Sequence, residues 1–100
     1  MDNSSYASLL MKTVDEYYPV DYLSGEILAL QSARRWAIFE LISALLDNPF
    51  DDPMDIAERI VGRIGCMIYI LQNKGESKRV NVLGEAMGAI LHAEENLFNH

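Results

Sequence analysis

The sequence predicts an all-α protein, a small four-helix bundle with one short N-terminal helix and three longer helices. In residues 52–100, apolar residues recur every three or four positions in two long stretches, and the turn-forming sequence Asn-Lys-Gly-Glu-Ser at 73–77 joins these stretches. Helices bury such apolar faces against other helices, so the last two should form an antiparallel hairpin. The chain has 100 residues, half of them apolar, which predicts a single helical domain over residues 1–100.

The first helix is expected from Ser5 to Tyr17. Its apolar residues recur at helical spacing. Ser4 or Ser5 can cap it, because a serine oxygen accepts a hydrogen bond from a free N–H group of the first turn. Pro19 should end it, since the residue before a proline avoids helical geometry.

The second helix is expected to begin after a cap at Asp21 or Ser24 and to run to Leu46. Apolar residues, Trp36 among them, cover most of its circumference rather than one stripe. A helix of this kind usually packs against two or more neighbours. We therefore expect it to be the central helix of the fold, with Trp36 in the core.

The third helix has the clearest start. Asp52 should cap it and Pro53 should take its first position, where a missing N–H has no cost. It should end near Asn73, with Gly75 in the left-handed conformation that closes many helices. Ser77 should cap the fourth helix, whose apolar residues follow a near-heptad spacing.

Charge and cysteine content exclude some functions. The net charge of −7 opposes non-specific binding to nucleic acids and to anionic membranes, and favours a partner protein with a basic surface. The single cysteine, Cys66, cannot form an intrachain disulfide; it lies within the third helix and is expected to be a small buried apolar residue. The N-terminus lacks the features of a signal peptide, and no apolar stretch is long enough to span a membrane, so a cytoplasmic location is expected.

The first candidate site is an acidic run around the connection between the second and third helices. Its carboxylates fall within twelve residues that contain no lysine or arginine; they are Asp47, Asp51, Asp52, Asp55 and Glu58. They either form a docking patch for a partner protein or act as helix caps with solvated neighbours. A calcium loop is not expected, because the order of ligands that such a loop requires is missing.

A second candidate for partner binding is the sequence Arg34-Arg35-Trp36, since arginine and tryptophan are frequent among the residues that dominate binding energies. Arg34 lies on the apolar line of its helix and should extend to water or pair with a carboxylate. Successive helical residues point in different directions, so the three need not act together.

Lys74, Lys78 and Arg79 surround the start of the fourth helix. Cations and free N–H groups at a helix start can hold an anion such as phosphate.

The last two helices contain four internal glycines, Gly62, Gly65, Gly84 and Gly88. Each reduces helix stability, and we expect this cost to be offset by a close approach of two helix backbones, within the chain or between subunits.

No catalytic or metal-binding pattern accompanies these candidates. His92 and Glu95 are one turn apart and Glu85 lies on a similar face, but two histidines are too few for the known helical metal sites. We expect no cofactor and no enzyme activity. The leading interpretation is a non-enzymatic protein–protein interaction module, an acidic inhibitor, immunity, anti-defence or regulatory protein, and a homodimer is expected. The alternative is a helical module that binds a nucleotide or small ligand through the basic residues near helix ends.

Overall fold

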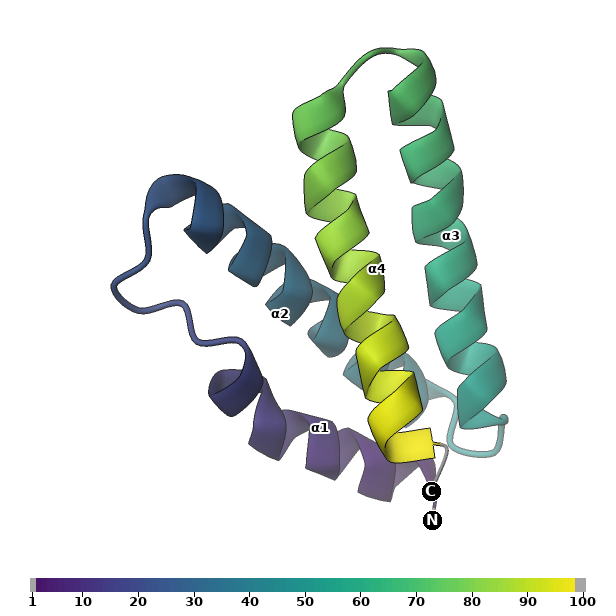
Figure 1. Ribbon diagram of the computed structural model, residues 1–100. Coiled ribbons are helices and arrows are strands. Elements are labelled where there is room, and N and C mark those ends of the chain that lie inside the picture. Colours follow the sequence, from purple (N-terminus) through teal and green to yellow (C-terminus); the bar gives the residue numbers. More distant parts are fainter. Residues whose placement is uncertain (1, 99–100) are drawn as a thin grey trace.

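The computed structural model describes residues 2–98, with side chains through residue 95, and contains no β-strand in that part of the chain. Its four helices are α1 (Asn3–Tyr17), α2 (Gly25–Asp47), α3 (Pro53–Asn73) and α4 (Ser77–Phe98). Figure 1 shows α3 and α4 side by side as an antiparallel hairpin, with α2 crossing behind α4 and α1 beneath α2. The predicted class, an all-α bundle of one short and three longer helices, is confirmed.

Helix α1 begins two residues earlier than predicted, because Asp2 and not a serine caps it. The Asp2 carboxylate accepts a hydrogen bond of 2.8 Å from the backbone N–H of Ser5. This bond stabilises the ionised carboxylate and lowers the pKa of Asp2. Ser5 is thus the residue whose N–H is capped, and the prediction of a Ser4 or Ser5 cap is wrong. The end of α1 at Tyr17 is confirmed.

Helix α2 packs against α4 and α1 most extensively and against α3 over a smaller area. This arrangement confirms the central position predicted for the second helix. Ser24 occupies its N-cap position, the second of the two predicted starts, and the helix continues to Asp47, one residue past the predicted end. The hairpin of α3 and α4 is attached to the rest of the fold mainly through α4.

The start of α3 and the turn into α4 follow the sequence closely. The Asp52 carboxylate accepts a hydrogen bond of 3.0 Å from the N–H of Met54, and Pro53 is the first helical residue. Gly75 adopts a φ of 74°, as predicted, and lets the N–H of Glu76 bond to the carbonyl of Leu71. The capping prediction for Ser77 is off by one residue. Ser77 is already helical, and Glu76 holds the capping position, because its carbonyl accepts the N–H of Val80.

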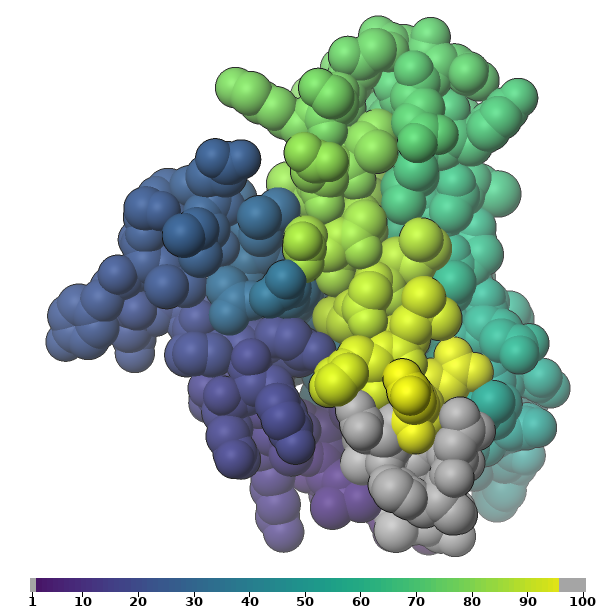
Figure 2. Space-filling model, in the orientation of Figure 1, coloured from purple at the N-terminus to yellow at the C-terminus, as the bar shows by residue number. Residues whose placement is uncertain are grey.

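The hydrophobic core occupies only one end of the hairpin. Among the described residues, the last buried side chain of α3 belongs to Ile64 and the first buried one of α4 to Ala86. Figure 2 shows the outer end of the hairpin standing clear of α1 and α2. Cys66 lies in this outer part and is exposed, so the prediction that its side chain is buried is wrong. Its helix has no third neighbour to cover that face.

The four helical glycines do not mark a close approach of two helices within the chain. A Cβ atom added at any of them would meet nothing within 4 Å outside its own helix; the positions are Gly62, Gly65, Gly84 and Gly88. The prediction that they allow close contact between the third and fourth helices is therefore wrong. Contact between subunits at these glycines stays a prediction.

Crossing a bilayer requires a helix that is both long and apolar, and no described helix meets both conditions.

Candidate functional site

The α2–α3 loop, residues 48–52, is the candidate site with the most defined structure. Asn48 caps the C-terminal end of α2 through two hydrogen bonds. Its backbone N–H and its side-chain amide both donate to the carbonyl of Ala44, at 3.1 and 2.8 Å. The N–H of Asp51 then bonds to the carbonyl of Asn48 and completes a turn. These bonds tie the loop to the end of α2 and define its shape.

Asn3 of α1 fastens this loop to the other end of the chain. Its side chain is only 3% exposed, and its amide donates hydrogen bonds of 2.7 Å to the carbonyl of Asn48 and 2.8 Å to that of Asp51. The two carbonyls flank Pro49 and Phe50. A single buried amide thus holds the loop on both sides of its tip.

Phe50 is presented at the tip of the fastened loop. Its side chain is 99% exposed, although phenylalanine is among the residues most often buried. Exposed residues of the acidic run precede and follow it, namely Asp47, Asp51, Asp52 and Asp55. The structure therefore joins the predicted acidic patch to an apolar anchor that the sequence analysis did not identify.

Most of the acidic run remains available for a partner. Within the described part of the chain, only Asp51 of this run has a cationic partner, the guanidinium of Arg59 at 3.3 Å. Asp52 uses one oxygen as the cap of α3. Asp47, Asp55 and Glu58 are exposed, so the patch presents an excess of negative charge to a partner.

Arg34, Arg35 and Trp36 do not join this patch. Arg34 pairs with Glu85 of α4, with its Nε 2.7 Å from the carboxylate, and its guanidinium also donates to the side chain of Gln31. This arrangement confirms that Arg34 pairs with a carboxylate.

The next two residues point elsewhere. Arg35 bonds to Asp15 of α1, and its guanidinium lies over the ring of Phe39, 5.9 Å from its centre. Trp36 is 46% exposed. The expectation that Trp36 belongs to the core is therefore wrong, because this face of α2 has no neighbouring helix in the described chain.

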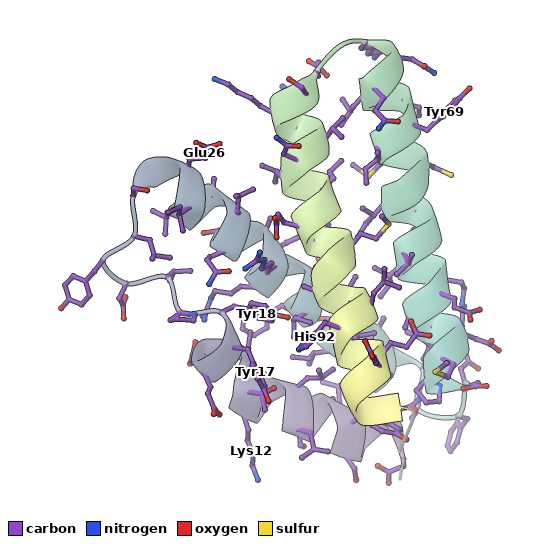
Figure 3. All side chains as sticks on the ribbon, in the orientation of Figure 1. Lys12, Tyr17, Tyr18, Glu26, Tyr69 and His92 are labelled. Atoms are coloured by element: carbon purple, nitrogen blue, oxygen red, sulfur yellow. The ribbon has the colours of Figure 1, made fainter. Side chains whose placement is uncertain are left out.

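A second group of polar side chains meets where α1 ends beside α4. The side chains of Tyr17, Tyr18, Arg34, Glu85 and His92 line an open cavity of about 350 Å³. Figure 3 shows Tyr17, Tyr18 and His92 close to one another, and the rings of Tyr17 and His92 make an edge contact at 6.2 Å. Burial raises the pKa of the Tyr18 phenol.

This cavity can hold a small polar molecule but shows no preference for an anion. The charge of Arg34 is already matched by that of Glu85, so the pair offers no excess positive charge for a phosphate. The sequence places Arg34 on the apolar line of its helix, but it gives no sign that Tyr17, Tyr18 and His92 lie beside it. The only signal for the pairing was an arginine on an apolar helix line.

The predicted anion site lies beside an apolar groove. Lys78 and Arg79 line it together with apolar residues of both hairpin helices, and its volume is about 510 Å³; the apolar lining is Met67, Ile70, Leu71, Val82 and Leu83. Arg79 also pairs with Glu76 at 3.6 Å, which offsets part of the positive charge. Lys74 is exposed at the preceding turn. An anion at these three residues stays a prediction.

The described residues contain no group of three or more His, Cys, Asp and Glu side chains that could hold a metal ion. Comparison of the chain with protein-family models, with curated proteins and with solved structures finds no match.

Proposed function

We propose that this protein is a non-enzymatic protein–protein interaction module and that its docking surface is the α2–α3 loop. One observation carries the proposal: Phe50 is fully exposed at the tip of a loop that Asn3 fastens on both sides. An exposed aromatic ring has a cost in water that burial in a partner's pocket would remove. A loop whose shape is already fixed loses little conformational entropy on binding.

The acidic residues around Phe50 define the chemistry of the partner. A pocket that accepts the ring should be apolar at its centre and should carry lysine or arginine residues at its rim. Opposite charges at the rim speed the encounter of two proteins, and the buried ring then slows their separation. Inhibitor, immunity, anti-defence and regulatory proteins of the cytoplasm are the classes that fit this mode of action.

Two variants of the loop test the proposal. Phe50→Ser removes the apolar anchor, and Asp51→Lys with Asp55→Lys reverses charge at exposed positions. Tyr22→Ser is the matched control, because Tyr22 is a fully exposed aromatic residue of the other long connection. The wild type and the variants are used as bait in extracts of the source cell, and a protein retained by the wild type and the control but lost with Phe50→Ser is then purified.

Binding kinetics with the purified partner complete the test. Phe50→Ser should raise the dissociation rate by about 30-fold or more, the size typical of a residue that dominates an interface. The charge reversals should slow association and weaken its dependence on salt. If the loop variants retain the same proteins as the wild type with unchanged rates, the α2–α3 loop is not the docking surface.

A further inference from the structure

A row of apolar side chains on the outward face of α2 is not covered by any other described helix. Leu28, Trp36, Phe39 and Leu46 are all exposed. With 100° of rotation per residue, these positions fall within about a quarter of the helix circumference. The exposed serines Ser32 and Ser43 fill the same strip between them. We call this strip, residues 28, 32, 36, 39, 43 and 46, the α2 row.

The α2 row has nearly the same order from either end. Read from residue 28 to residue 46 it is Leu, Ser, Trp, Phe, Ser, Leu. Trp36 and Phe39 are equally far from a midpoint between residues 37 and 38, and so are Ser32 and Ser43. Two such helices placed antiparallel around that midpoint would bring Trp36 of one copy against Phe39 of the other, and Ser32 of one copy opposite Ser43 of the other. A surface that matches itself in this way is what a two-fold symmetric contact requires.

Charged residues border the row on both flanks. With 100° of rotation per residue, Arg35 lies about 60° to one side of the row's centre line and Glu40 about 80° to the other. In an antiparallel two-fold pair each flank meets the same flank of the other copy, so Arg35 and Glu40 would lie at opposite edges of the contact. The charge of Arg35 is already matched by Asp15, and Glu40 is exposed.

We infer that two copies of this chain form a symmetric dimer through antiparallel contact of their α2 rows, centred between Trp36 and Phe39. The occupant of the exposed face is thus a second copy, with Trp36 of one copy packed on Phe39 of the other at the centre. The inference does not rest on the proposed partner-binding loop, since the row lies on α2 itself.

Sedimentation equilibrium of the full chain tests the dimer. The wild type should show twice the chain mass of 11.3 kDa. Leu46→Glu and Trp36→Glu should each weaken dimerisation by about 30-fold or more, because each places a charge in an apolar contact. Met11→Glu is the matched control, since Met11 and Leu46 are both 54% exposed but Met11 lies on α1. The control should remain dimeric, and circular dichroism should show that every variant is folded.

Disulfide formation then tests the antiparallel register. In a background with Cys66→Ser, the variants Ser32→Cys and Ser43→Cys are oxidised separately and as a mixture. The inferred dimer gives a cross-linked product in the mixture only, because residue 32 of one copy lies against residue 43 of the other. A wild type that is monomeric at every concentration, a dimer that persists in Leu46→Glu and Trp36→Glu, or a product from Ser32→Cys alone would each overturn the inference.

Discussion

Replacing Asn3 with alanine should destabilise the whole fold and loosen the proposed docking loop. The substitution removes the two hydrogen bonds that the side-chain amide donates to the carbonyls of Asn48 and Asp51. Each such bond contributes about 0.5–1.5 kcal/mol, so the pair contributes about 1–3 kcal/mol. Alanine has the higher helix propensity, which returns about 0.5 kcal/mol. The free energy of unfolding should therefore fall by about 1.5 kcal/mol, and Tm by about 6–12 °C for a domain of this length.

Urea unfolding followed by circular dichroism measures this loss. Ser4→Ala is the matched control, because Ser4 is exposed and makes no hydrogen bond through its side chain within the described part of the chain. The isosteric variant Asn3→Asp separates hydrogen bonding from packing. At neutral pH its carboxylate would face two carbonyl oxygens, so it should be less stable than Asn3→Ala. This extra loss should shrink as the pH falls and the introduced carboxylate is protonated.

The reasoning fails if Asn3→Ala and Ser4→Ala unfold at the same urea concentration. It also fails if Asn3→Asp is as stable as the wild type at neutral pH, because the orientation of the amide would then be irrelevant.

Four further substitutions test other parts of the structure by urea unfolding. Leu41→Ala should cost about 2–5 kcal/mol, since Leu41 is completely buried, and a loss below 1 kcal/mol would contradict its place in the core. Gly62→Ala should raise stability by about 0.5–1 kcal/mol, because the added methyl group meets open space; destabilisation would indicate a neighbour. Tyr22→Gly should gain about 1 kcal/mol by relieving a φ of 64° at a fully exposed side chain, and a loss would show that the ring has a contact. Glu94→Gln should stabilise the protein at neutral pH but not below pH 4.5. Burial and the nearby charge of Glu58 raise the pKa of Glu94, so the wild type loses stability as this carboxyl ionises. A gain in stability that is equal at both pH values would contradict this explanation.

The sequence predicted best those features that depend on neighbouring residues. Asp52 and Pro53 at the start of α3, and Gly75 at its end, act through bonds to residues only a few positions away. Such signals need no knowledge of the tertiary structure. The bounds of the hairpin helices followed from them, and the fold class followed from the hairpin.

The sequence predicted poorly which apolar faces have a neighbour. Helical spacing shows that Trp36 and Cys66 lie among apolar residues, but it does not show whether another helix covers them. The same limitation explains the wrong account of the helical glycines. The link from Asn3 to the α2–α3 loop joins residues 45 and 48 positions apart, and the composition of the polar N-terminus gave no sign of it.

The confinement of buried side chains to one end of the hairpin has a consequence for how the molecule moves. Residues 65–85 contain no fully buried side chain, only half-buried ones such as Ile68, Val82 and Leu83, so separating the outer turns of α3 and α4 exposes less apolar surface than opening the core does. Amide hydrogens there should exchange with solvent through a local opening, well before those of Leu41 or Ile90. A protease added in small amounts should make its first cut in this segment and leave α1 and α2 intact. The molecule thus combines a rigid base with an end that can open on its own.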